Sequence, residues 1–400
     1  MTTRITGAKV ILVDDVVETD VLIHDDKIIE VGGSTPADRI IDGRGYYLAP
    51  AMIDVHGDAF ERQMMPRPNV FFPTEAALLE TDRQLASNGI ATAYHALTLS
   101  WEPGLRSVER GEAFLDALAA LEKRFTIENR VQLRWETFAF EAVDLIERAL
   151  ETPLLPSIAF NDHTSMTLRS LDLPVQERLF EHNPRFEVAD LDDPRFKQRA
   201  GRIAPRAGLS SNDYYDLLVD VWQRRADVPE MIVKVSNWGK AKQVPMLSHD
   251  DTQKETRDFF RSMGASISEF PMRVAVAQAA SKAGDTIVFG SPNVVRGGSH
   301  IGSPSAADMV EDGLCDVLAS DYFYPAMLAA VARLHDERRS DLPTLWSLVS
   351  GGPAKASGLH DRGEIKAGNR ADLILIDWPD GATPAVKLTL SKGNTAYGAI

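Results

Sequence analysis

LAPAMIDVHGDAFE, residues 48–61, joins an apolar run to a histidine and an aspartate two positions apart. Residues at this spacing on a β-strand point to the same side of the strand. His56 and Asp58 therefore face one point where the strand leaves the core, which is how two ligands are presented to a metal ion. A solvated loop that happens to contain both residues is the alternative interpretation.

On either side of this stretch the sequence changes character. Both ends of the chain are β-branched runs punctuated by Asp and Gly, whereas the middle alternates apolar strands with helical patterns. Two β-rich ends around a long middle predict that the termini pair into one small sheet domain. We expect residues 1–51 and 359–400 to form a composite β-sandwich domain and residues 52–358 to form the catalytic domain.

The middle contains eight strand–helix repeats, and no strand pattern is joined to the next by a tight turn. Such alternation predicts a parallel sheet with crossover helices. Eight repeats fit a closed (β/α)8 barrel better than an open doubly wound sheet, so we expect the α/β class and a TIM-like barrel. The section from about 164 to 245 is longer than one crossover needs and is predicted to be a helical insertion.

Composition bounds the class of partner. The 400 residues carry a net charge of −15, with 44% hydrophobic and 25% charged residues. An ordinary globular composition with an acidic balance argues against nucleic-acid or membrane binding but is compatible with a small anionic ligand. The single cysteine, Cys315, excludes an intrachain disulfide and is predicted to be buried. We expect a cytoplasmic protein, because no signal peptide or membrane-length run is present. A homo-oligomer is compatible with this composition.

Polar residues gather where the predicted barrel strands end. In such barrels the carboxyl ends of the strands build the active site. The residues at these ends are His56, Asp58, Arg134, Glu136, Asn161, Asp162, His163, His249, Asp250, Asp251, Glu269, Asn293, Arg296, Ser299, His300 and Asp321. By contrast, His95 lies inside an apolar strand and is interpreted as a core residue.

Histidines and carboxylates at this rim predict a metal centre. The expected ligands are His56, Asp58, Glu136, His163, His249 and Asp321. Unpaired buried carboxylates are costly, and a divalent cation neutralises them. Imidazole and carboxylate without thiolate suit zinc, manganese, iron or nickel. Two ions bridged by Glu136 or Asp58 would use every ligand, whereas one ion would leave some for acid–base work.

A second group of residues predicts an anion site. GSPNVVRGGSH, residues 290–300, and the loop with Arg67 in MMPRPNVFFP, residues 64–73, both follow barrel strands. Glycines allow close backbone approach, and Arg, Ser and His supply donors for phosphate oxygens. Two ordinary surface loops with one arginine each are the alternative. The expected substrate-binding residues are Arg67, Asn293, Arg296, Gly297, Gly298, Ser299 and His300.

The β-rich ends and the opening PAMIDVHGD resemble the amidohydrolase superfamily. Together, DVHGDAFERQMMPRP, LSHDD, ISEFP, GSPNVVRGGSH and ASDY are similar to the diphosphatases of the carbon–phosphorus lyase pathway, which act on α-D-ribose 1-methylphosphonate 5-triphosphate. This resemblance implies a cytoplasmic enzyme of phosphonate metabolism that uses a metal, zinc first of all, and releases diphosphate. It also implies a barrel of the metal-dependent hydrolase type. The predicted catalytic residues are His249 and Asp321, with Asp321 taking a proton from the attacking water.

The chain departs from the commoner superfamily pattern in two ways. Asp58 stands where many members carry a second histidine, and no lysine is found where many carry a carboxylated bridging lysine, so Glu136 is the expected substitute. Two other functions remain open. An ordinary amidohydrolase acting on a C–N bond, such as a cyclic-amide hydrolase, N-deacylase or deaminase, would use the same metal centre, and a non-catalytic scaffold would need no metal.

Overall fold

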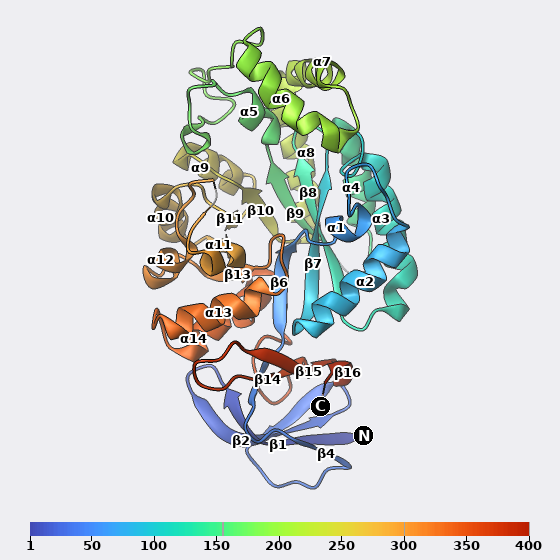
Figure 1. Cartoon of the computed structure of the whole chain (residues 1–400), viewed down its shortest axis with the longest axis vertical. Coiled ribbons are helices and arrows are strands. Elements are labelled where there is room, and N and C mark those ends of the chain that lie inside the picture. Colours follow the sequence, from blue (N-terminus) through green and yellow to red (C-terminus); the bar gives the residue numbers. More distant parts are fainter. Residues whose placement is uncertain (154–155, 300, 400) are drawn as a thin grey trace.

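The computed structural model describes residues 1–153, 156–299 and 301–399. Two β-sheets organise the chain: a barrel formed by the middle of the sequence and a sheet formed by both termini (Figure 1). The expected fold class, a TIM-like (β/α)8 barrel with a small β-domain built from both ends, is confirmed.

The barrel strands run parallel and in sequence order, from β6 to β13. The ring nearly closes where Gly57 forms a parallel bridge with Asp321. There the Asp58 N–H donates to the Asp321 carbonyl at 2.9 Å, and the Asp321 N–H donates to the His56 carbonyl at 2.9 Å. The strands are β6 Met52–Gly57, β7 Ile90–Leu99, β8 Glu128–Glu136, β9 Ser157–Asn161, β10 Met246–His249, β11 Ile267–Glu269, β12 Thr286–Gly290 and β13 Val317–Ala319.

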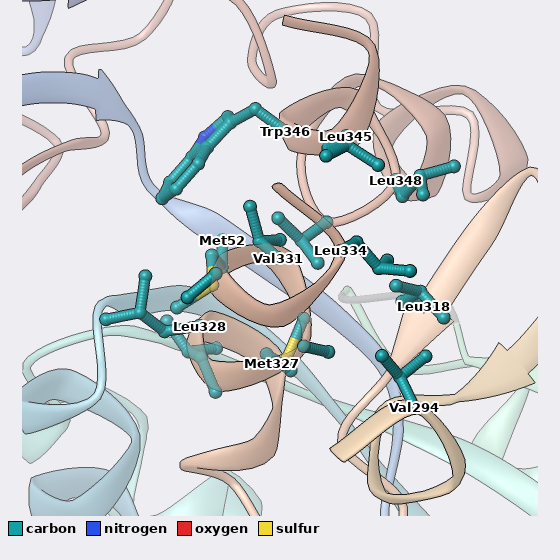
Figure 2. Packing of buried hydrophobic residues seen from close by; sticks show 14 of the residues in the cluster. Met52, Val294, Leu318, Met327, Leu328, Val331, Leu334, Leu345, Trp346 and Leu348 are labelled. Atoms are coloured by element: carbon teal, nitrogen blue, oxygen red, sulfur yellow. The ribbon is translucent and has the colours of Figure 1, made fainter. Parts of the chain in front are cut away.

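Helices cover the outside of the barrel, which explains why strand β7 is buried at every position. Figure 2 shows one part of this layer, where helix α13 packs on strands β6 and β13. Met327, Val331 and Leu334 repeat at the i, i+4, i+7 spacing of a single helix face, and all three are fully buried. Burying a side chain of this size stabilises the fold by about 1.5–3 kcal/mol.

The helices that follow or precede barrel strands are α1 Glu61–Met64, α2 Thr74–Ser87, α3 Val108–Leu121, η1 Glu122–Arg124, η2 Phe140–Ala142, α4 Val143–Ala149, α9 Lys254–Ser262, α10 Val274–Ala283, α11 Ser291–Arg296, α12 Ala306–Glu311, α13 Ala326–Asp336, α14 Leu342–Ser347 and α15 Gly351–Ala356. Among the helices of the described residues, none has the length and apolar character needed to cross a membrane.

The terminal sheet has the order β16-β15-β14-β5-β1-β2-β3, with β4 also paired to β1. Its strands are β1 Thr2–Ile11, β2 Val16–His24, β3 Lys27–Val31, β4 Arg39–Asp42, β5 Tyr47–Pro50, β14 Leu373–Asp377, β15 Ala385–Ser391 and β16 Asn394–Gly398. Strand β5 joins the two ends of the chain because it pairs with both β1 and β14. The exact domain limits, 51/52 and 358/359, stay a prediction.

The segment between β9 and β10 contains α5 His163–Leu168, η3 Val175–Glu177, α6 Pro194–Ala207, α7 Ser211–Trp222, η4 Gln223–Ala226 and α8 Val228–Lys242. Helix α8 packs with the barrel helices and serves as the crossover, whereas α6 and α7 form a separate small core. Asp193 caps α6, and Gly208 ends it at φ +70°. In Figure 1, α6 and α7 lie at the end of the barrel far from the terminal sheet.

Candidate metal centre and adjoining clefts

His56 is the most unusual side chain of the barrel mouth. It is fully buried, and neither ring nitrogen has a hydrogen-bond partner among the described residues. Its Nδ1 does lie 3.1 Å from Oε1 of Glu269, a distance that allows attraction but without hydrogen-bond geometry. Buried polar atoms are almost always partnered. An imidazole left this way is suited to donate a lone pair to a cation.

Strand β6 is fixed in place by the residue two positions before His56. Buried Asp54 accepts hydrogen bonds from the Ser320 N–H at 3.0 Å and the Ser320 hydroxyl at 2.5 Å. Burial raises the pKa of Asp54 above its usual value. These bonds tie β6 to the residue after β13, so they help to set where His56 and Asp321 lie relative to each other.

Glu269, at the end of β11, lies at the edges of two stacked imidazoles, with one carboxylate oxygen near Nδ1 of each ring. His56 and His249 are 5.4 Å apart between ring centroids, at an interplanar angle of 13°. His249 donates from Nδ1 to Oε2 of Glu269 at 2.7 Å, and Gln132 donates to the other oxygen at 2.8 Å. Burial opposes ionisation of Glu269, but His56 and His249 hold its pKa well below the usual range. Glu269 is therefore ionised: it orients the His249 ring by a hydrogen bond and lies 3.1 Å from Nδ1 of His56.

Three overlapping sets of donor atoms at this rim have the spacing of metal ligands. In each set the atoms lie within 4.8 Å of one another. The sets are His56–Asp58–Asp321, His163–His249–Asp250 and His56–His249–Glu269. Five predicted ligands thus come together from strand ends far apart in the sequence. Asp250 and Glu269, which the sequence places at the same rim, join them although they were not among the predicted ligands.

The electrostatics of Asp321 favour the binding of a cation beside it. Burial raises the pKa of Asp321 to about 6, and the neighbouring charge of Asp58 adds to the effect. Two acidic groups in one partly buried place disfavour each other's ionisation. A cation between them would reverse this effect, because it favours the ionised form of both.

Glu136, expected to be a ligand or bridge, instead contacts a ligand candidate. Its carboxylate accepts hydrogen bonds from Nδ1 of His163 and from the His163 N–H, the latter at 3.0 Å. It belongs to none of the donor sets found in the described part of the chain. Burial opposes its ionisation, yet His163 and Arg134 lower the pKa of Glu136 to about 2. The geometry fits a carboxylate that orients His163 and leaves Nε2 free.

Arg134 brings a positive charge into the centre. This arginine of β8 donates from Nη2 to Nε2 of His249 at 2.7 Å and from Nε to Asn161 at 3.0 Å. Its Nη1 lies 3.6 Å from Asp58. Because His249 accepts at Nε2, its proton is on Nδ1, which donates to Glu269. Burial lowers the pKa of His249, which favours the neutral imidazole, and a cation at Nε2 would take the place of the Arg134 hydrogen bond.

A first cleft, of about 520 Å³ including its open part, leads from Asp250 and Asp321 to the loop after β12. Its wall includes Arg296, Gly298 and Ser299. Gly297 and Gly298 have φ values of +79° and +136°, which glycine adopts at little cost, and Gly297 ends α11. Arg296 thus lines the same cleft as Asp321, one of the predicted metal ligands.

The other predicted substrate residues do not all line this cleft. Asn293 lines the same cleft, but its side chain also holds the following loop through the Pro304 carbonyl at 2.9 Å and the Ala306 N–H at 3.0 Å. Arg67 is exposed in a tight turn and does not line this cleft. His300 falls outside the described residues.

A second and larger cleft, of about 1200 Å³ including its open part, lies between the centre and the insertion. His163, Glu136 and Asp250 form one side of it, and α6 contributes arginines to the other. Asp250 lines both clefts, so they meet at the candidate centre. The expected core histidine, His95, lies elsewhere: it is buried and bonds Asn129 at 2.8 Å.

Comparisons with known proteins agree with this architecture. A model of the amidohydrolase family matches residues 223–397. α-D-Ribose 1-methylphosphonate 5-triphosphate diphosphatase of Escherichia coli (strain K12) is 26% identical over 377 residues, which are 93% of this chain and 94% of that protein. The predicted resemblance is thereby confirmed.

Solved structures share the fold over nearly the whole length. Phenylurea hydrolase B has a TM-score of 0.63 at 14% identity, with 99% of this chain and 96% of that chain covered. A zinc-bound adenosine deaminase from Xanthomonas campestris has a TM-score of 0.62 at 12% identity, with coverage of 98% and 92%. A triazine hydrolase variant has a TM-score of 0.61 at 15% identity, with coverage of 98% and 94%.

Proposed function

We propose that this chain, a hydrolase of the amidohydrolase superfamily, cleaves a phosphoanhydride bond of α-D-ribose 1-methylphosphonate 5-triphosphate or a similar sugar triphosphate and releases diphosphate. The metal dependence rests on the buried imidazole of His56. Neither of its ring nitrogens has a hydrogen-bond partner among the described residues, and the carboxylates of Asp58 and Asp321 lie beside it. The phosphoanhydride part is supported by the relative that covers 93% of the chain and by an arginine cleft beside the same carboxylates.

The residues present fit a divalent cation. His56, Asp58 and Asp321 would hold one ion, and His163, His249 and Asp250 would hold another where two are bound. Imidazoles and carboxylates without thiolate suit zinc, manganese, iron or nickel. A cation held there supplies Lewis acidity, which makes water a nucleophile near neutral pH. Glu269 and Glu136 would keep the imidazoles in their ligating orientation.

Asp321 is the proposed proton acceptor. Its carboxylate closes the barrel rim next to Asp58 and also lines the first cleft, where a substrate phosphoryl group would lie. A carboxylate in that position takes the proton of the attacking water as the P–O bond forms. The electrons of the cleaved anhydride then leave with the diphosphate oxygen. A positioned acceptor of this kind contributes about 10²–10⁴-fold in rate.

Arg296 is the proposed phosphate ligand of the first cleft. Arg296 is the last residue of α11, and the two glycines after it leave space for oxygen atoms to approach the backbone. A fork of N–H donors matches phosphate oxygens in geometry and charge. Donors aimed at charge that develops on the leaving diphosphate stabilise the transition state more than the ground state.

The test is an assay of purified protein for the product released. Protein incubated with zinc, manganese, iron or nickel is given the sugar triphosphate, and diphosphate is measured against inorganic phosphate. The same preparation is tested for ammonia or acid release from cyclic-amide, N-acyl and amino-heterocycle substrates. The proposal expects diphosphate, loss of it in Asp321→Asn, and retention of it in Arg195→Gln, which changes an exposed ion pair. Release of ammonia or acid without diphosphate would establish the C–N alternative instead.

A further inference from the structure

The wall of the second cleft carries four arginines that differ in how they are neutralised. Arg106 donates to both oxygens of Glu61 at 2.8 and 2.9 Å, and Arg206 donates to Glu102 at 2.8 Å. Within the described residues, no carboxylate lies within 4.0 Å of Arg169 or Arg199. The insertion therefore presents two uncompensated positive charges to the cleft.

These two guanidiniums are held by backbone carbonyls only. Arg169 donates from Nη1 to Met166 and from Nε to Leu173 at 3.1 Å. Arg199 donates from Nη1 to the carbonyls of Thr167 at 3.1 Å and of Arg169 at 3.0 Å. The described chain offers no acceptor to Nη2 of Arg169 or to Nε and Nη2 of Arg199. The side chains are thus oriented, while part of each donor fork is available to a ligand.

Two like charges in one half-buried place are unfavourable without a counterion. Burial lowers the pKa of Arg169 to about 10, with Arg199 and Arg178 contributing, and burial also lowers the pKa of Arg199. These arginines bind backbone carbonyls of the segment around Arg169. If this were their whole role, a carboxylate beside each guanidinium would lower the free-energy cost of partly burying its charge. An anion bound between them would turn the unfavourable interaction into a favourable one.

We infer that Arg169 and Arg199 form an anion subsite for a phosphate or phosphonate group of the substrate that lies away from the metal centre. The inference rests on the proposed function, because it assigns the second cleft to the substrate of that reaction. It gives the insertion a role in choosing substrates with negative charge on both sides of the bond that is cleaved.

The position of the pair relative to the centre supports this assignment. Helix α5 begins at His163, a candidate ligand, and Arg169 directly follows its last residue. Six helical residues rise by about 9 Å. Arg296 lies in the other cleft, and Asp250 borders both. A substrate crossing the centre would therefore meet Arg296 with one anionic end and the arginine pair with the other.

The chemistry of the pair favours a tetrahedral dianion over a carboxylate. Two guanidiniums place several N–H donors around one volume, and phosphate or phosphonate supplies three oxygens and up to two charges. A carboxylate supplies two oxygens and one charge, which leaves one arginine unpaired. The matched control is Arg195 on the same helix, α6, because its guanidinium is 62% exposed and already paired with Asp193 and Asp172.

The test is calorimetric titration of methylphosphonate, a probe for the distal group, into the full-length, metal-loaded protein and its variants. Arg169→Gln and Arg199→Gln should each weaken methylphosphonate binding about tenfold or more, because a charge-assisted pair of bonds is lost, while Arg195→Gln stays within about twofold of wild type. Circular dichroism checks folding. If a glutamine variant does not fold, Arg199→Lys replaces it, and we expect about threefold weaker binding because the fork is lost.

Methylphosphonate affinity that is unchanged in the folded Arg169 and Arg199 variants, or methylphosphonate binding that is absent in wild type, would overturn the subsite. The outcome is separable from that of the proposed function. Weakened binding in these variants without any diphosphatase activity in wild type would support the subsite and reject the reaction. Diphosphatase activity with unaltered binding in the variants would reject the subsite and leave the reaction standing.

Discussion

Strand β8 begins with Glu128 and ends with Glu136, and the two carboxylates lie at opposite ends of the barrel. Glu128 accepts from Arg130 at 2.7 Å, Arg362 at 2.9 Å and Arg370 at 2.5 Å, and the last arginine also binds buried Asp372. Although burial opposes it, these arginines hold the pKa of Glu128 well below its usual range. Every group of this cluster has a partner.

The mouth end has equally buried charge but not the same balance. His56 has two unpartnered nitrogens, and Asp321 has a raised pKa beside another carboxylate. Buried charge alone therefore does not indicate a ligand-binding site. A cluster that satisfies itself connects the C-terminal segment to the barrel, whereas a cluster that needs one more partner is prepared for a ligand.

The largest effect is expected at the mouth. Asp321→Asn should lower kcat of diphosphate release by about 10²–10⁴-fold, since it removes the proton acceptor. The melting temperature should not fall, because the variant removes a carboxylate whose ionisation is disfavoured by burial and by Asp58. Steady-state kinetics and thermal denaturation check both statements. An active Asp321→Asn protein would show that another group takes the proton.

The opposite result is expected at the other end. Glu128→Gln leaves the buried charges of Arg362 and Arg370 without their shared partner and should destabilise the fold by about 3–5 kcal/mol. Denaturant unfolding measures this loss. At temperatures where the variant is folded, its kcat should match wild type. A fall in kcat with unchanged stability would break the distinction between the two ends.

Glu136→Gln is expected to have an intermediate effect. An orienting carboxylate typically contributes 10–100-fold in metal affinity or activity, so a loss in that range is expected. Competition with a chelator gives the metal affinity. A loss as large as that of His56→Gln would instead make Glu136 a direct ligand, as the sequence first suggested.

The smallest effect is a pH dependence. Because the folded pKa of Glu128 lies below its unfolded value, its contribution is complete above that value, about 4.5, and is lost as pH falls. The stability difference between wild type and Glu128→Gln should therefore be constant from pH 6 to 8 and should shrink below about pH 4.5. Urea unfolding across this range measures it. A difference that grows on acidification would contradict the assigned ion pairs.

Much of this architecture follows from sequence pattern alone. Period and alternation predict the barrel, and the rule that parallel strands end at one rim predicts that His56, His163, His249 and Asp321 gather there. Residue type does not reveal which carboxylate faces a cation and which one orients a ring. Glu136 and Glu269 both end strands, but only coordinates show one on His163 and the other between His56 and His249.

The insertion was less predictable for a physical reason. Arg169 and Arg199 lie in a charged, helical section with many other arginines. Which of these arginines have a carboxylate partner cannot be inferred from sequence spacing, because the partners are distant in sequence. Arg67 shows the reverse case, because an arginine that follows the first strand points away into an exposed turn. Loop direction is set by contacts that the local sequence does not specify.

The most direct test of the central claim is the metal content of purified protein, measured by plasma mass spectrometry in wild type, Glu128→Gln and the double variant His56→Gln/His249→Gln. About one or two equivalents of a divalent metal are expected in wild type and in Glu128→Gln, and less than about a tenth of an equivalent in the folded double variant. Equal metal in all three proteins, or none in wild type, would contradict the account.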